Sequence, residues 1–261
     1  MVERIRKDAS AEGARVAVFD FDGTISLIRS GWQDVMIPMM VEFLAGTGTD
    51  ESEEELAAVV KDFVDRLTGR QTMYQMIELA EQIAKRGGKP DDPLVYKRIY
   101  LDRLHSRISD RLEELRSGNA DPVKYHVPGS LALLDALKDR GFTMYLASGT
   151  DQVYLREEAR LLGVYDYFDG GVFGALDDYK SFSKKILIQG IIRDSKFKGE
   201  EFLGFGDGYV EIENVKEVGG CAVGIATEEP ECRKVDEWKR ERLVNVGADS
   251  SCPISRISTP S

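Results

Sequence analysis

The sequence predicts an α/β protein, an open parallel sheet interrupted by an all-helical insert. From about residue 127 to 246, short apolar runs alternate with helical patterns, as in parallel strands covered by helices on both faces. From about residue 30 to 120, helical patterns follow one another with no convincing strand between them. An apolar run at 16–19 precedes this insert. We therefore expect a discontinuous core of residues 1–28 and 122–261, and a helical cap of residues 29–121.

The expected elements of the core alternate along the chain. Apolar runs predict strands at Val16–Phe19, Phe142–Ala147, Phe202–Phe205 and Cys221–Ala226, with a weaker run at Leu243–Val246. Apolar residues at helical spacing predict helices at Ser130–Arg140, Gln152–Leu162, Lys184–Arg193 and Val210–Val218. The Ser- and Pro-containing stretch from Ser250 to Ser261 is expected to fray.

Four helical patterns make up the insert. They cover Trp32–Leu44, Glu53–Leu67, Met73–Arg86 and Leu94–Arg116. Gly-containing segments separate them, and the segment DESE at 50–53 is typical of a helix start, where acidic side chains and a capping serine are favourable.

Composition excludes several classes of function. The net charge of −11 argues against binding nucleic acid or anionic membranes through a basic surface. No stretch approaches the roughly 20 apolar residues of a membrane helix, and the N-terminal segment lacks the apolar centre of a secretory signal. The 3 cysteines have no metal-ligand spacing, and their odd number favours a reducing, cytoplasmic setting.

Polar residues follow three of the expected strands. DFDGT at 20–24 comes after the first strand, SGTD at 148–151 after the second, and GDG at 206–208, then Glu211, after the third. Ligands of open parallel sheets bind outside the carboxyl ends of the strands. Each segment alone could be a turn or a helix cap. Their convergence on one edge of the sheet predicts a ligand site.

The residue types indicate phosphate chemistry. Asp20 and Asp207, with a backbone carbonyl near Asp22, offer the hard oxygen ligands that Mg²⁺ prefers. Ser148, expected at the start of a helix, could donate its hydroxyl and nearby backbone N–H groups to a phosphate. Asp20 could then act as a nucleophile, and Asp22 could protonate the leaving alcohol and later activate water.

At this point a family resemblance is plain. The segments DFDGT, ASGT and GFGDGYVEIEN, with a lysine between the last two, resemble the four motifs of the haloacid dehalogenase superfamily of phosphohydrolases. They match in order and spacing, and the resemblance spans about Arg15 to Val246. It implies a Rossmann-like core, a helical cap inserted after the first strand, and Mg²⁺ as cofactor.

The resemblance also implies roles for the two motif aspartates and the phosphate-binding residues. Asp20 would attack phosphorus to form an aspartyl-phosphate, and Asp22 would be the general acid and base. Ser148, supported by Gly149 and Thr24, would bind the transferring phosphoryl group.

The remaining implied roles concern the metal and the lysine. Asp207 would hold Mg²⁺ with Asp20 and Asp22, and Glu211 would orient the lysine or a metal-bound water, although aspartate is commoner at that position. Three lysines could take the lysine role, in the order of preference Lys184, Lys185 and Lys180. Lys184 stands 23 residues before Asp207, a spacing similar to that of the phosphoserine phosphatase branch.

The cap is expected to select the substrate. Residues near the junctions are the expected readers: Arg29, Ser30, Trp32 and Gln33. Arg70, which opens a cap helix, is a further substrate-binding candidate, although a solvated helix start is at least as good an explanation. If Arg70 does face the site, Arg70→Ala should raise KM more than it lowers turnover.

The function predicted is a Mg²⁺-dependent phosphatase acting on a small phosphorylated metabolite such as a sugar phosphate. Asp22 argues against dehalogenation and phosphonate cleavage, because those branches lack an acid there. Two alternatives stay open, a phosphomutase of the beta-phosphoglucomutase type and a catalytically silent protein that binds a phosphometabolite. No nucleic-acid or membrane partner is expected.

Overall fold

The computed structural model describes residues 3–7, 9–176, 183–194 and 197–252, and they fall into two compact units. The core unit comprises Met1–Ser30 and Leu112–Ser261, and the helical unit comprises Gly31–Arg111. The first boundary lies two residues after the expected one. The second lies inside a helix rather than after it, ten residues before the expected end of the insert at 121.

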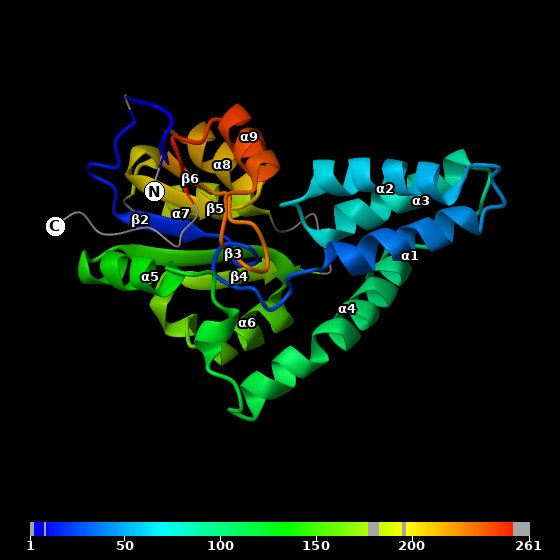
Figure 1. Ribbon diagram of the computed structural model, residues 1–261. Helices are drawn as coiled ribbons and strands as arrows, with labels where there is room; N and C mark the ends of the chain where they lie inside the picture. Colours follow the sequence, from blue (N-terminus) through cyan, green and yellow to red (C-terminus); the bar gives the residue numbers. More distant parts are fainter. Residues whose placement is uncertain (1–2, 8, 177–182, 195–196, 253–261) are drawn as a thin grey trace. The chain divides into compact units, whose positions relative to one another are not determined.

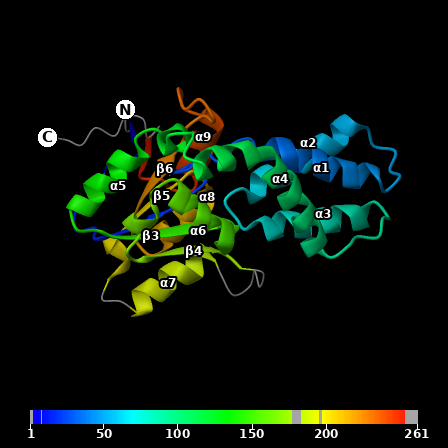
Figure 2. The same ribbon diagram turned by 90° about the horizontal axis from the view of Figure 1, so that it is seen from below.

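One seven-stranded sheet forms the centre of the core unit, in the order β1-β7-β6-β5-β2-β3-β4. All of its pairings are parallel except that of β1 with β7. The strands are β1 (Glu3–Arg4), β2 (Val16–Phe19), β3 (Thr143–Asp151), β4 (Gly171–Ala175), β5 (Phe202–Gly206), β6 (Cys221–Ile225) and β7 (Ser250–Cys252). Figure 2 shows β6, β5, β3 and β4 in this sequence across the sheet. The α/β fold class is confirmed.

Helices cover both faces of this sheet (Figure 1). They are α5 (Ser130–Asp139), α6 (Gln152–Leu161), α7 (Lys184–Asp194), α8 (Tyr209–Glu217) and α9 (Glu237–Asn245). The helices α5 and α6 lie on one face, and α7, α8 and α9 lie on the other. Short 3₁₀ segments at Pro122–Tyr125, Tyr165–Tyr167 and Gly199–Glu201 lead into strands or helices.

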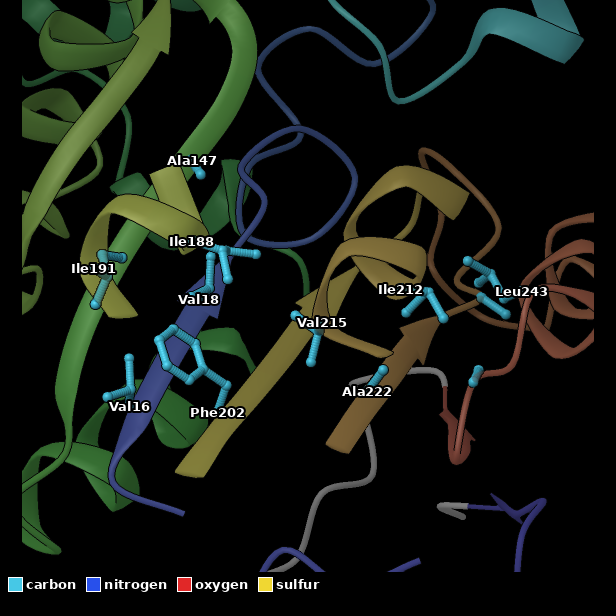
Figure 3. Close-up of a cluster of buried hydrophobic side chains, with 12 residues drawn as sticks. Val16, Val18, Ala147, Ile188, Ile191, Phe202, Ile212, Val215, Ala222 and Leu243 are labelled. Atoms are coloured by element: carbon cyan, nitrogen blue, oxygen red, sulfur yellow. The ribbon is translucent and has the colours of Figure 1, made fainter. Parts of the chain in front are cut away.

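The apolar β2 strand has both of its faces buried, as its four consecutive apolar residues require. Val16 and Val18 point to the face that carries α7 and α8, where Figure 3 shows them near Phe202 and Ile188. Phe19 stacks on Phe205 of β5, with ring centroids 4.6 Å apart. This two-sided packing holds β2 rigidly in the middle of the sheet, and its last residue leads directly into the DFDGT segment.

The helical unit contains α1 (Gln33–Ala45), α2 (Glu53–Leu67), α3 (Thr72–Lys85) and most of α4 (Pro93–Arg116), whose last five residues belong to the core unit. The expected acid-rich start of α2 is a full capping box: Ser52 accepts a bond from the N–H of Glu55, and the Glu55 side chain accepts from the N–H of Ser52. No helix in the described ranges has the length and apolar character needed to cross a membrane.

Two sequence predictions need correction, and strand β4 was missed. The weak run Leu243–Val246 is not a strand, because Leu243 is a buried residue of α9, which runs to Asn245. The stretch from Ser250 does not fray at its beginning, since Ser250–Cys252 pair with β6 and β1 as β7. The strand β4, at Gly171–Ala175, was not predicted, because its glycines dilute the apolar pattern.

Candidate active site

The polar segments predicted to converge do meet at the carboxyl ends of neighbouring strands. β2 lies between β5 and β3 and is parallel to both, so the three strands end at the same edge. The N–H of Asp20 donates to the carbonyl oxygen of Phe205 at 2.9 Å, which extends the ladder one residue beyond β2. Asp20 is thereby fixed by the sheet itself, and the residue is 6% exposed.

The loop after Asp20 folds around one carbonyl group. The oxygen of Phe21 accepts bonds from the N–H groups of Ile25 and Ser26 at 2.8 and 2.9 Å, while the Phe21 ring is fully buried. Gly23 has a φ of 71°, a conformation that favours glycine, and a Cβ there would overlap the Asp207 carboxylate. The loop is therefore tight, and it lies directly against the segment after β5.

A buried lysine lies beside Asp20. The Nζ atom of Lys184 is 2.9 Å from Oδ1 of Asp20 and also contacts Oε1 of Glu211. Of the other two lysines considered, Lys185 pairs with the exposed Glu217 at 2.7 Å, and Lys180 lies outside the described residues. Lys184 is thus the described lysine that reaches the first aspartate, because it occupies the first turn of α7.

Asp22 combines burial with an unused oxygen. Its Oδ2 accepts a bond from the Thr150 hydroxyl at 2.7 Å, and its Oδ1 is buried without a partner among the described residues. Burial raises the pKa of Asp22 to about 7, despite the opposing charge of Arg29. A carboxyl group with this pKa exchanges a proton readily near neutral pH.

Asp20 and Asp207 influence each other electrostatically. Burial raises the pKa of Asp20, the charge of Lys184 opposes that rise, and the repulsion by Asp207 adds to it. The two carboxylates therefore lie close enough to repel across the edge of the sheet. Such a pair favours a cation between its members.

The sequence suggested that Ser148 begins a helix, but the structure places this residue within strand β3. β3 continues through it to Asp151 with an irregularity in its pairing, and α6 begins at Gln152. The Ser148 Oγ accepts a hydrogen bond from the N–H of Thr150 at 3.0 Å, which leaves the hydroxyl hydrogen of Ser148 available for donation. Gly149 lies between the two.

Thr24 ties the first segment to the third. Its Oγ1 accepts a bond from the N–H of Asp207 at 3.1 Å, and the residue is fully buried. This hydrogen bond connects the DFDGT loop to the segment after β5. Thr24 therefore aligns these two segments, in addition to its predicted role in phosphate binding.

A second ammonium group contacts Asp207. Lys239 of α9 places its Nζ atom 2.9 Å from Oδ2 of Asp207 and 2.6 Å from Oε1 of Glu229. Burial alone would lower the pKa of Lys239, but the two carboxylates raise it above its ordinary value. Sequence reasoning missed both Lys239 and Glu229, since the polar segment that contains them has no recognisable motif.

The described residues of the site carry an excess of acidic groups. The ammonium groups of Lys184 and Lys239 contact four carboxyl groups, those of Asp20, Glu211, Asp207 and Glu229. Such an excess of acidic groups favours a bound cation. No set of three or more His, Cys, Asp or Glu side chains within the described ranges is arranged to hold a metal alone. Mg²⁺ would therefore take Asp20, Asp207, a backbone carbonyl near Asp22, and water, as its preference for hydrated oxygen sites allows.

A buried ion pair, Arg29 with Glu158, acts electrostatically on Asp22. The guanidinium of Arg29 donates to the Glu158 carboxylate, with the closest contact at 2.7 Å, and it lies 5.7 Å from the centre of the Tyr154 ring. Arg29 and Glu158 are 6% and 2% exposed. Arg29 was expected to read the substrate, but here it is occupied by Glu158. The signal for Glu158 was its place on the otherwise apolar face of α6, with Leu155 and Ala159.

Arg70 belongs to the helical unit. It is exposed just before α3 and stacks over Tyr74, 5.6 Å from the ring centre. Its proposed part in substrate binding stays a prediction.

Comparison with protein families gives one match over most of the chain. The model of the haloacid dehalogenase-like hydrolases matches residues 14–219. No curated protein matches this chain significantly in sequence.

Solved structures with the same fold include three whose names state an activity, a family or a bound sugar. A beta-phosphoglucomutase from Clostridium difficile is 16% identical, with 89% of this chain and 98% of that chain covered and a TM-score of 0.57. A haloacid dehalogenase-like family hydrolase from Streptococcus pneumoniae is 15% identical over 93% and 96% of the chains, with a TM-score of 0.56. CbbY from Rhodobacter sphaeroides, in complex with xylulose-(1,5)bisphosphate, is 16% identical over 94% and 96%, with a TM-score of 0.55.

Proposed function

Because this chain belongs to the haloacid dehalogenase-like hydrolases, we propose that it is a Mg²⁺-dependent phosphatase that hydrolyses a small phosphorylated metabolite, such as a sugar phosphate. The observation that carries this proposal is a lysine-bound carboxylate, Asp20, two residues before a partly buried carboxyl group, Asp22, whose pKa is about 7. One can attack phosphorus while the other supplies a proton.

In the first half of the proposed reaction, an oxygen of Asp20 attacks the phosphorus atom and the bond from phosphorus to the leaving oxygen breaks. The Asp22 proton moves to that oxygen, so the alcohol leaves neutral. Lys184 holds Asp20 in position and balances the charge on the phosphoryl oxygens, and the Ser148 hydroxyl donates to one of them.

In the second half, the ionised Asp22 takes a proton from water, and the resulting hydroxide attacks the phosphorus of the aspartyl-phosphate. The bond between phosphorus and Asp20 breaks, which releases inorganic phosphate and restores both carboxyl groups. The orphan Oδ1 atom of Asp22 supports this role, because it has hydrogen-bonding capacity left for the alcohol or the water.

Magnesium, when bound by Asp20, Asp207 and a carbonyl near Asp22, would neutralise the phosphate charge that otherwise repels an attacking carboxylate. Glu211 contacts Lys184 and so keeps that ammonium directed at Asp20. The helical unit is proposed as the cap that selects the substrate.

The test is phosphate release from a panel of phosphorylated metabolites, with and without Mg²⁺. We expect release that requires Mg²⁺ and is lost in Asp20→Asn, a change that keeps the shape of the side chain and removes the nucleophile. Formation of an isomer without phosphate release would identify the mutase alternative instead. Binding of a metabolite without turnover of any compound would contradict catalysis.

The cytoplasm is proposed as the compartment because the chain has 3 cysteines, an odd number that suits a reducing environment better than a disulfide framework.

A further inference from the structure

The ion pairs of Asp207 involve residues outside the four motifs. Lys239 comes from α9, and Glu229 comes from the loop after β6. The side chains of Asp207, Lys239 and Glu229 are 14%, 16% and 19% exposed, so water screens their charges only partly. We call these three residues the Asp207 triad.

The fold brings the triad against the loop that contains the nucleophile. A Cβ on Gly23 would lie 2.8 Å from Oε1 of Glu229 and closer still to Asp207, so both acidic groups approach the bare backbone there. Thr24 fixes the Asp207 backbone at 3.1 Å, and Lys239 fixes one oxygen of its side chain. The carboxylate is therefore oriented from two sides.

Charge distinguishes the two partners of Asp207. Lys239 places a positive charge 2.9 Å from a metal-binding carboxylate, which repels an incoming cation and draws electron density from Asp207. Glu229 lies 2.6 Å from the same ammonium and offsets that charge. Removing the Lys239 charge makes the surroundings of the metal site more negative by one charge, and removing the Glu229 charge makes them more positive by one.

We propose that Lys239 and Glu229 are positioning residues that set how tightly the Asp20–Asp207 site holds its divalent cation. Lys239 orients Asp207 and weakens cation binding by its charge, and Glu229 restores part of the attraction. The pair thus keeps the ion exchangeable while the geometry of Asp207 stays fixed. This inference rests on the proposed Mg²⁺-dependent function.

The experiment is calorimetric titration of the full chain with Mg²⁺ alone, at about pH 8, where ordinary carboxyl groups are ionised. Lys239→Met should tighten Mg²⁺ binding and Glu229→Gln should weaken it, each by roughly tenfold, the lower range seen when partners of metal ligands are changed. The double variant should return close to the wild-type affinity, and Lys239→Arg, which keeps the charge, should remain near it.

The matched control is Lys216→Met, which removes the same charge and an ion pair to the buried Asp249, at 2.7 Å, that is not part of the proposed site. Its Mg²⁺ affinity should equal that of the wild type. If Lys239→Met misfolds by circular dichroism, Glu229→Gln and Lys239→Arg still test the inference.

Two results would overturn it. Weaker binding in both single variants would mean that the pair only maintains the local fold, and equal affinities in all variants would mean that it does not act on the metal. Either result leaves Mg²⁺-dependent phosphate release by the wild type intact. A wild type that binds no Mg²⁺ would remove this inference and the metal requirement together.

Discussion

At the scale of single residues, the core unit buries several charged side chains beside a partner of opposite charge. Arg29 and Glu158 are the clearest case, because both are more than nine-tenths buried. Removing one member of such a pair strands the other charge in a medium of low polarity, whereas removing both leaves only apolar volume.

We therefore expect Arg29→Met to lower the free energy of unfolding by about 3–5 kcal/mol, and Arg29→Met/Glu158→Met to recover most of that loss. Denaturant unfolding measures both. The control is Arg103→Met, which breaks an equally well-formed pair with Glu42 at 2.8 Å on the surface and should cost less than about 1 kcal/mol. Equal losses in the two single variants would contradict the argument.

His126 makes stability depend on pH. Its Nε2 lies 3.0 Å from the carbonyl oxygen of Leu162, and burial lowers its pKa below the ordinary value of 6.5. As the pH falls, His126 therefore binds a proton in the unfolded chain before it does so in the folded chain. With respect to His126, the folded state keeps its full stability above pH 6.5 and loses stability as the pH falls toward the lowered pKa.

Unfolding free energies measured from neutral pH down through this range should fall more steeply for the wild type than for His126→Gln. An unchanged slope in His126→Gln would show that His126 does not cause it.

At the scale of elements, segments with a strong hydrophobic pattern were predicted correctly, and segments with a weak pattern were not. The helix α2 was predicted with its observed bounds, and β2 likewise, because an amphipathic pattern or a run of four apolar residues marked each. The helix α9 was mistaken for a strand because its buried face depends largely on Leu243, amid charged residues.

The same reasoning applies to the candidate site. Asp20, Asp22, Lys184 and Asp207 could be proposed because each follows a strand or begins a helix in a recognisable segment. The partners Lys239 and Glu229 could not, since they are separated by ten residues in sequence and meet only when α9 packs beside β6. Ser148 was assigned to a helix start because the bulged end of β3 has no mark in sequence.

The capping box of α2 gives a prediction at this scale. Ser52→Ala removes the acceptor of the Glu55 N–H and should destabilise the helical unit by about 1 kcal/mol, measured by denaturant unfolding. Ser109→Ala, within the exposed middle of α4, should have little effect or a slightly favourable one. A loss in Ser109→Ala equal to that in Ser52→Ala would argue against a capping effect.

At the scale of the whole molecule, the ligands proposed for Mg²⁺ all belong to the core unit. A cation at 100 times its dissociation constant should therefore stabilise that unit by about 2.7 kcal/mol. Thermal unfolding with and without Mg²⁺ would report this gain, and hydrogen exchange should place it in the strands β2 and β5 rather than in α2. In Asp207→Asn the gain should be much smaller. An undiminished gain there would place the ion elsewhere.

The position of the insert between β2 and β3 has a consequence for the newly made chain. β2 emerges from the ribosome before the insert, yet Val16 pairs with Thr143 and with Phe202, which both follow the insert. The four apolar residues of β2 must therefore wait until the whole insert has been synthesised before either neighbouring strand exists. The insert, built from helices adjacent in sequence, closes shorter loops and can form meanwhile. Nascent chains that end between the insert and β5 should therefore bind chaperones most strongly. A circular permutant that starts near residue 118 should shorten the time for which β2 is unpaired.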